Sequence, residues 1–243
     1  MNVRTAIVTG AGRGIGAAIA RELAAQGIQV VVNYARRRDE AQATVDAILR
    51  AGGKAFAVQA RVESTEELDR LFEQAQEKFG GLDILVNNAG VSATAPLDML
   101  DAAFIDVAFA TNVKGMILAS QRAAKAFGAA GGAIVNVSSI MSLQPVPAHV
   151  VYAASKAAIE AATRVLAQEL GARKIRVNAV APGPVDTELA ALNDGLRAFI
   201  NSKTPLGRVG APEDIAKVVA FLVSDASAWI NGEVINVSGG LRV

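Results

Sequence analysis

Apolar residues occur along the chain in short unbroken runs, separated by longer segments of mixed character. Most runs are rich in β-branched residues and end at glycine or at a polar residue. Such runs are typical of strands that are buried on both faces of a sheet. The pattern predicts seven strands, at residues 5–9, 29–33, 54–60, 82–87, 133–137, 175–180 and 233–237.

The segments between the runs have helical periodicity and are closed by glycine or proline. Helices are predicted to end near 27 and at 51, and to cover 63–79, 101–128, 152–170 and 212–224. Because strands and helices alternate through short loops, we expect a parallel sheet with helices on both faces. No linker or repeat divides the chain, so residues 1–243 are interpreted as one domain. Glycine and proline interrupt the segment 187–210, which is interpreted as a mobile helical lid.

Composition removes several classes of function. The 243 residues are 52% hydrophobic, and 24 basic side chains nearly balance 23 acidic ones. This balance, without long runs of one charge, argues against a nucleic-acid or membrane-surface partner. The absence of cysteine excludes disulfides and thiolate catalysis, and a single histidine argues against a metal site. Since the N-terminus lacks a signal-peptide pattern and no uncharged apolar run is of membrane-spanning length, a cytoplasmic location is expected.

A glycine-rich turn links the first predicted strand to the first helix, with glycine at 10, 12, 14 and 16. Strand, glycine turn and helix in this order form the context of a dinucleotide site. Glycine lets the backbone approach a pyrophosphate, and the helix N-terminus offers free N–H groups. A purely structural turn is the alternative.

The end of the second strand indicates which dinucleotide is used. An acidic residue there binds the 2′-hydroxyl of the ribose in NAD enzymes. Here the chain has Asn33 and Tyr34, followed by arginine at 36, 37 and 38. Three cations near a helix N-terminus oppose the helix dipole, which a 2′-phosphate would offset. We therefore predict NADP(H) in preference to NAD(H), with Arg13 and Arg36 or Arg37 as ligands; a solvated turn is the alternative.

The candidate chemistry lies in Tyr152, Lys156 and Ser139. Tyr152 and Lys156 are four residues apart in a predicted helix and share one face. A nearby ammonium, together with a cationic nicotinamide ring in a water-poor cleft, is expected to lower the pKa of the phenol from about 10. Ser139 ends the strand run thirteen residues upstream. Taken alone, the pair is also compatible with an ordinary tyrosine and a solvated lysine.

Asn112 lies within the helix predicted over 101–128. Local sequence favours an exposed asparagine at this position. A buried one would need hydrogen-bond partners, which a kinked helix with ordered water would supply.

Taken together, the motifs resemble the short-chain dehydrogenase/reductase family over essentially the whole chain, from Thr5 to Gly240. The resemblance depends on the glycine turn, the segment 87–90 (Asn-Asn-Ala-Gly), and Pro182 with Gly183. It also depends on the ordered set Asn112, Ser139, Tyr152 and Lys156. It implies a Rossmann-type, doubly wound, parallel seven-stranded sheet and an NAD(P)-dependent enzyme that acts on CH–OH groups.

The family's roles can be carried to matching positions. Tyr152 is implied as the general acid/base, and Ser139 as a hydrogen-bond partner of the substrate oxygen. Lys156 is implied to hold the nicotinamide ribose and to lower the pKa of Tyr152, and Asn112 to position a water that connects Lys156 to solvent. No metal is implied.

The implied cofactor contacts run along the whole chain. Asn87 and Gly90 are implied on the ribose side, and Thr187 with the Val185 backbone near the carboxamide or pyrophosphate. The full implied set is Gly10, Arg13, Gly14, Ile15, Gly16, Asn33, Tyr34, Arg36, Arg37, Arg61, Val62, Asn88, Ala89, Gly90, Tyr152, Lys156, Pro182, Gly183, Val185 and Thr187.

Two positions depart from the family pattern or add to it. Arg61 stands where the family often has an aspartate that binds the adenine amino group, so Arg61 is expected either to stack on the adenine or to turn to solvent. His149 precedes Tyr152 by three residues, and a surface-loop role is favoured over contact with substrate. The candidate substrate pocket comprises Val91, Ser92, Met141, Pro145, His149, Leu189 and Leu192.

The expected activity is that of an NADP(H)-dependent carbonyl reductase or alcohol dehydrogenase on a small molecule. Alternatives are a 3-oxoacyl-thioester (acyl-carrier-protein) reductase, an NAD-dependent sugar or polyol dehydrogenase, and a non-catalytic dinucleotide-binding regulator. Alanine-rich helices over 109–128 and 151–171 permit close helix packing, and the resemblance implies a homotetramer built on them.

Overall fold

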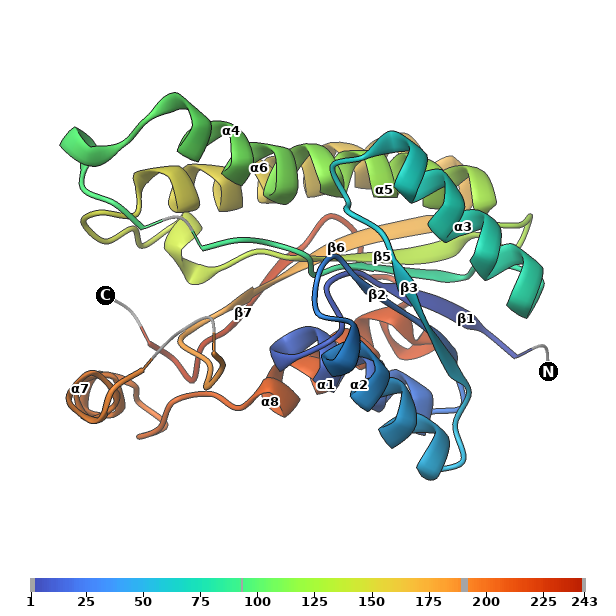
Figure 1. The fold of residues 1–243 in the computed structure, drawn as a ribbon, viewed down its shortest axis with the longest axis horizontal. Helices are drawn as coiled ribbons and strands as arrows, with labels where there is room; N and C mark the ends of the chain where they lie inside the picture. The colour runs from blue at the N-terminus through green and yellow to red at the C-terminus, as the bar shows by residue number, and fades with distance from the viewer. Residues whose placement is uncertain (1–2, 93, 189–191, 242–243) are drawn as a thin grey trace.

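The computed structural model describes residues 3–92, 94–188 and 192–241. Its centre is a seven-stranded parallel sheet with strand order β3-β2-β1-β4-β5-β6-β7 (Figure 1). The strands are β1 (Thr5–Val8), β2 (Gln29–Tyr34), β3 (Ala55–Gln59), β4 (Ile84–Asn87), β5 (Gly132–Val137), β6 (Ile175–Pro182) and β7 (Val234–Val237).

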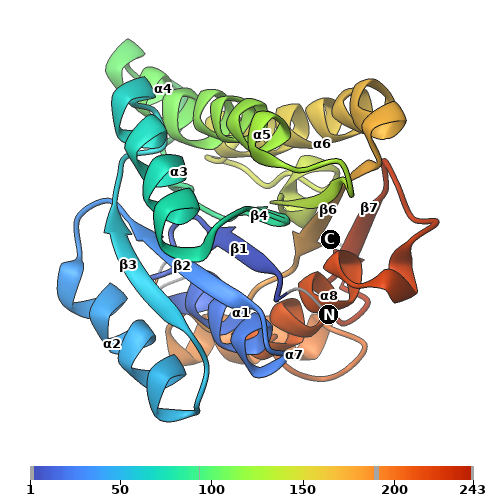
Figure 2. The same cartoon turned by 90° about the vertical axis from the view of Figure 1, so that its right-hand side faces the viewer.

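Helices cover both faces of the sheet, as the end-on view in Figure 2 shows. One face carries α1 (Gly14–Ala25), α2 (Arg38–Arg50) and α8 (Pro212–Val223). The other face carries α3 (Thr65–Phe79), α4 (Ala102–Phe109), α5 (Gly115–Ala126) and α6 (Val150–Leu170). Helix α7 (Asp194–Lys203) lies beyond the carboxyl ends of the strands (Figure 1).

Two apolar cores hold the three layers together. Ile7, Val31 and Leu85 occupy neighbouring register positions on β1, β2 and β4 and face α3 and α5. The alternate residues of the same strands, such as Val8 and Val32, face α1 and α2. All five side chains are fully buried. The continuous apolar runs are therefore explained by a sheet that is covered on both faces.

The predicted elements agree with the structure to within two residues at each end. The helix predicted over 63–79 is α3, and its N-cap is Ser64, whose Oγ accepts a hydrogen bond from the backbone N–H of Glu67. Short 3₁₀ turns, such as Ile140–Ser142 after β5, were not predicted. A single turn has too little sequence periodicity to be recognised.

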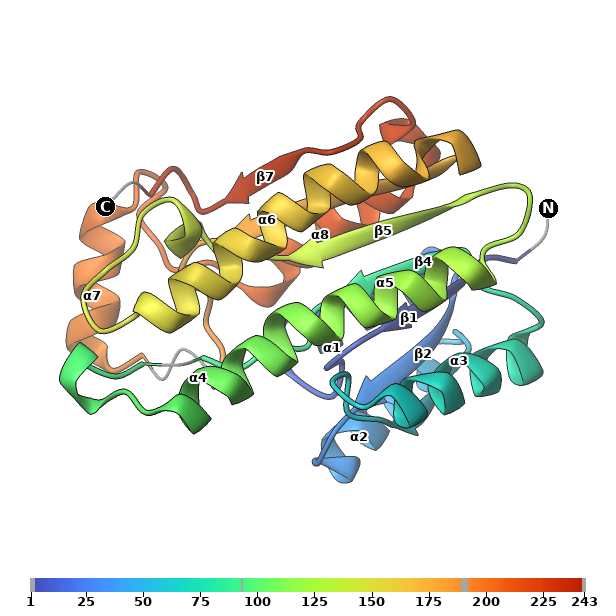
Figure 3. The same cartoon turned by 90° about the horizontal axis from the view of Figure 1, so that it is seen from above.

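Helices α4 and α5 are joined by a π-helical turn, Ala110–Lys114, into one rod that runs beside α6 (Figure 3). Among the described residues, this rod is the one helix whose length and apolar composition would suit a membrane span. The rod packs against α6, β4 and β5. Its place over the sheet accounts for the apolar residues on its inner side.

The strand order places a crevice at the centre of the sheet. The chain proceeds from β1 to β2 and β3 on one side, and from β4 to β7 on the other. In open parallel sheets, ligands bind outside the carboxyl ends of the strands at such a switch point. Here the glycine turn after β1 faces the segment 88–91 after β4.

Candidate active site

The glycine turn is held by side chains from the neighbouring strands. Asn88 donates hydrogen bonds from Nδ2 to the carbonyls of Thr9 and Gly10, at 2.9 and 3.0 Å. A Cβ atom on Gly16 would lie only 2.4 Å from Asn88 Nδ2. Gly10 has a φ of +61°, a conformation that favours glycine. The turn therefore requires glycine at both positions.

The Asn33 side chain, at the end of β2, holds this turn through hydrogen bonds. Its side chain is buried and donates to the carbonyls of Val58 and Ala60 at 3.3 and 2.9 Å. Its Oδ1 accepts a hydrogen bond from the Gly10 N–H at 3.3 Å. The Asn33 amide is thus engaged with the backbone of β3 and of the turn, and it orients the turn.

A cleft of about 940 Å³ opens along the glycine turn. Most of the predicted cofactor contacts line it: Gly10, Arg13, Gly14, Ile15, Gly16, Asn33, Tyr34, Arg36, Arg37, Arg61, Val62, Asn88, Ala89, Gly90 and Thr187. Thr187 closes one side, since a Cβ on Gly14 would touch its Cγ2 at 3.4 Å. One cleft thus collects segments from both halves of the sheet.

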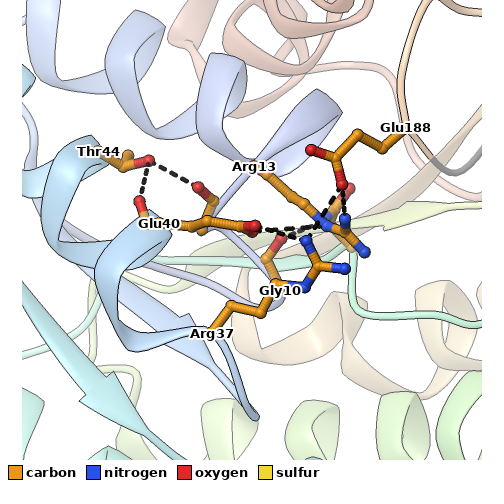
Figure 4. A network of polar contacts seen from close by, with 8 residues as sticks. Gly10, Arg13, Arg37, Glu40, Thr44 and Glu188 are labelled. Atoms are coloured by element: carbon orange, nitrogen blue, oxygen red, sulfur yellow. Dashed lines mark hydrogen bonds and ion pairs between the residues drawn. The ribbon is translucent and has the colours of Figure 1, made fainter.

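An ion-pair network lies at the mouth of the cleft (Figure 4). The Arg37 guanidinium donates to Glu40 Oε1 at 2.6 Å and to Glu188 Oε2 at 3.2 Å. Arg13 also donates to Glu188 Oε2, and its Nε lies 3.7 Å from Glu40 Oε2. Two carboxylates therefore neutralise two cations at the site where a 2′-phosphate was predicted.

The other two predicted cationic positions behave differently. Arg36 lines the cleft and takes part in none of the ion pairs found among the described residues. The Arg61 guanidinium donates two hydrogen bonds to Glu67 Oε1, at 2.8 and 2.7 Å, and stays exposed on the cleft wall. Glu67 therefore fixes the Arg61 guanidinium. This ion pair was part of neither alternative, which were stacking on the adenine and turning to solvent.

The three residues of the predicted chemistry come together beside this cleft. The Ser139 hydroxyl is hydrogen-bonded to the Tyr152 hydroxyl and lowers its pKa. Lys156 Nζ lies 5.5 Å from the centre of the Tyr152 ring and donates to the Val137 carbonyl at 2.9 Å. A Cβ on Gly90 would lie 3.6 Å from Nζ, so the ammonium borders the cleft wall. The sequence prediction that these side chains meet agrees with this geometry.

The lowered pKa predicted for Tyr152, which included a bound cationic nicotinamide as well as Lys156, is not present in the protein alone. Burial raises the pKa of Tyr152, and the Ser139 hydrogen bond opposes this only in part. Burial also lowers the pKa of Lys156, to about 8. The ammonium lies over the aromatic ring and bonds to a strand carbonyl. In the absence of a nicotinamide, burial is therefore the main cause of the shift at both groups.

Asn112 is buried, which corrects the expectation of an exposed residue. It lies in the π-helical turn between α4 and α5. Its Nδ2 donates to the Val91 carbonyl at 3.1 Å and to Ser155 Oγ at 3.0 Å, and its Oδ1 accepts from the Val91 N–H at 2.8 Å. The π turn aims Asn112 at the strand end after β4, and protein groups satisfy its amide.

Tyr152 and Lys156 stand beside the cleft, and four further residues that were implied to contact the cofactor do not line it either. Pro182 ends β6, Gly183 bonds to the Val237 carbonyl, and Val185 is buried beside Gly210. Asn87 points away from the expected ribose side, because its Nδ2 bonds to Ser120 Oγ at 3.0 Å and to Asn136 Oδ1 at 2.8 Å. These residues support the floor of the site and the layer of α5.

Only some residues of the predicted substrate pocket lie at the cleft. Val91 lines it, and His149 Nε2 lies 3.2 Å from Thr94 Oγ1. His149 Nδ1 lies 2.9 Å from the Pro147 carbonyl, so the imidazole joins the 94–95 segment to the start of α6. Leu189 lies outside the described residues.

Sequence reasoning missed Glu40, Glu188 and Glu160. Glu188 directly follows the predicted Thr187, which was a usable signal. Glu160 stands four residues after Lys156, on the same face of α6, and is buried. A charged residue at helical spacing from a predicted catalytic lysine was the available signal.

The burial of Lys156 predicts how stability depends on pH. Its pKa is about 8 in the folded chain and about 10.4 in an unfolded one. Between these values the unfolded chain holds a proton that the folded chain has released, so the free energy of unfolding rises with pH. Relative to Lys156→Met, the wild type is expected to gain about 2 kcal/mol between about pH 8 and about pH 10, measured by urea denaturation. A difference that stays constant over this range would contradict a buried, perturbed lysine.

Comparison with known proteins agrees with this geometry. A family model described as enoyl-(acyl carrier protein) reductase matches residues 10–242. An uncharacterized oxidoreductase of Methylorubrum extorquens is 48% identical over 243 residues, covering 98% of each chain. The versicolorin reductase stcU of Emericella nidulans is 40% identical and covers 98% of this chain and 95% of its own.

Solved structures give the same result. The angucycline C-6 ketoreductase LanV with bound NADP superposes with a TM-score of 0.92 at 40% identity, over 98% of this chain and 95% of its own. Sequence and fold therefore agree over nearly the full length. The chain belongs to the short-chain dehydrogenase/reductase family, whose members are NAD(P)-dependent oxidoreductases that act on carbonyl and hydroxyl groups.

Proposed function

We propose that this protein is an NADP(H)-dependent oxidoreductase that transfers hydride between nicotinamide and a small carbonyl or secondary alcohol. The observation that carries the proposal is the Ser139–Tyr152 hydroxyl pair, which lies beside Lys156 where that lysine borders the glycine-turn cleft. In this arrangement a proton donor can reach the substrate oxygen next to a bound dinucleotide.

The cleft fits a dinucleotide on its own geometry. The glycine turn leaves no room for side chains at Gly10 and Gly16 and opens at the N-terminus of α1, which suits a pyrophosphate. Arg13, Arg36 and Arg37 gather at one end, where a 2′-phosphate would carry complementary charge. A bound NADP(H) would supply the hydride.

The chain's own residues would handle the proton. In the reducing direction, the Tyr152 hydroxyl donates its proton to the carbonyl oxygen while the Ser139 hydroxyl hydrogen-bonds that oxygen. Burial keeps the Tyr152 hydroxyl protonated in the free protein, which suits the acid role. Lys156 then helps to return a proton to Tyr152, and Asn112, fixed by the π turn next to Gly90, orients the relay toward solvent.

We also propose a domain organisation, a cellular location and an oligomeric state for this chain. We place the whole chain in one domain with a lid near 187–210, in the cytoplasm, and in a homotetramer. Support for assembly comes from exposed apolar side chains on the rod and α6: Ile117 and Val165 are 44% and 52% exposed. Such side chains suit subunit contacts.

The test is a comparison of initial rates with NADPH and NADH. The substrate panel includes aldehydes, ketones, diketones, sugars and β-keto thioesters. Versicolorin and angucycline ketones are added because two similar proteins are named a versicolorin reductase and an angucycline ketoreductase. We expect kcat/KM for the cofactor to be higher with NADPH than with NADH. Faster turnover with NADH would refute the cofactor assignment, and binding without turnover on every substrate would favour a regulator.

A further inference from the structure

Glu160 is a buried carboxyl group that the proposed reaction does not use. It lies on α6, one turn after Lys156, and is only 3% exposed. Burial of a carboxyl group is costly unless hydrogen bonds compensate for the lost water. No described cation forms a salt bridge with it. Its retention inside the protein therefore calls for a specific set of partners.

These partners flank the candidate catalytic serine. Ser138 Oγ donates to Glu160 Oε1 at 2.8 Å, and Ser142 Oγ donates to the same oxygen. Ser142 Oγ also lies 2.8 Å from the carbonyl oxygen of Ser139 itself. The carboxyl group thus bonds to the residue before Ser139 and to the last residue of the 3₁₀ turn that follows it.

Lys156 contacts the same segment one helical turn earlier. Its Nζ donates to the Val137 carbonyl at 2.9 Å, and Ser138 Oγ lies 3.2 Å from the Lys156 carbonyl. Two side chains on one face of α6 therefore hold consecutive residues at the end of β5. Tyr152 stands on the same helix, one turn before Lys156.

We propose that Glu160 is a positioning residue, which locks the 138–142 segment to α6 so that the Ser139 hydroxyl stays next to the Tyr152 hydroxyl. The inference rests on the proposed roles of Ser139 and Tyr152. Glu160 lies too deep to touch a substrate, and it acts through Ser138 and Ser142.

The test separates hydrogen-bond geometry from charge and from folding. Glu160→Ala removes the acceptor, whereas Glu160→Gln keeps a carbonyl oxygen at the same place. Glu169→Ala, on the exposed end of the same helix, is the matched control. We expect Glu160→Ala to lower kcat on the order of 10–100-fold with an unchanged Kd for NADPH, and Glu160→Gln and Glu169→Ala to stay within about threefold of wild type.

The pH profile gives a second readout that a merely structural role would not move. The Ser139 hydrogen bond lowers the pKa of Tyr152, so its loss raises that pKa. In the alcohol-oxidation direction, the pH at which Glu160→Ala reaches half of its maximal rate is therefore expected to move upward, while Glu169→Ala keeps the wild-type profile.

Other outcomes would overturn the inference. Wild-type kcat in a folded Glu160→Ala protein would do so, as would an equal loss in Glu160→Gln, which would assign the effect to charge. If Glu160→Ala does not fold, Ser142→Ala takes its place: it removes one hydrogen bond to Glu160 and should lower kcat about three- to tenfold with normal NADPH binding. An active Tyr152→Phe protein would instead refute the proposed function itself, so the two failures are distinguishable.

Discussion

The Tyr152→Phe variant is expected to lose turnover by a factor on the order of 10³ while it binds NADPH like the wild type. The substitution removes only the hydroxyl that donates the proton. The ring keeps its packing against the buried cluster of Ala108 and Val151, and the Lys156 ammonium still has an aromatic face beside it. The loss should therefore appear in kcat, with little change in folding.

The measurement pairs steady-state rates with fluorescence titration of NADPH and urea denaturation. A true loss of the acid leaves the binding curve and the unfolding midpoint in place. Turnover within about tenfold of wild type would place the proton donor elsewhere and would end the assignment of Tyr152. The Ser139→Ala variant should show a smaller loss, since it removes a hydrogen bond to the substrate oxygen but leaves the donor.

Removal of Arg13 and Arg37 together is expected to weaken NADPH binding about 100-fold and NADH binding by less than about threefold. Each guanidinium can form a charge-assisted hydrogen bond to a 2′-phosphate, and the loss of each bond is expected to weaken binding about tenfold. NADH lacks the phosphate and would lose little. The Arg50→Ala variant at the far end of α2 is a control for the general effect of a lost charge.

Substitution of Glu188 is expected to change the affinity for NADPH in the opposite direction. Its carboxylate pairs with both arginines and must leave before a phosphate can take its place. Glu188→Gln is therefore expected to tighten NADPH binding by a few-fold and to leave NADH nearly unchanged, since exposed ion pairs contribute up to about 1 kcal/mol. Equal effects on both cofactors, in either variant, would show that the cluster does not read the 2′ position.

Sequence reasoning was sound where structure depends on neighbours along the chain. Unbroken apolar runs such as 30–32 indicate strands that are buried on both faces, and the i,i+4 spacing places Tyr152 and Lys156 on one face of a helix. The order of glycines after β1 likewise determines the turn at the N-terminus of α1. These features depend on backbone geometry that a few consecutive residues fix.

The hydrogen-bond partners and the burial of individual polar side chains could be known only from the tertiary structure. Arg13 and Glu188 are 175 positions apart, and no local pattern relates them. Asn87 was misplaced, and local sequence favoured an exposed Asn112, because local sequence does not say which helix packs on which strand end. The direction of the Tyr152 pKa in the protein without a nicotinamide also required the structure, since it depends on how much water the fold removes.

The sequence by itself determined the order of strands and helices, the glycine turn and the set of residues able to do the chemistry, because short-range periodicity and spacing encode these. Only the tertiary structure decided that Glu160 sits behind Ser139, that two carboxylates occupy the arginine cluster, and that Lys156 is buried over the Tyr152 ring. Desolvation and pairing between distant segments set these outcomes, and both arise only once the chain has packed.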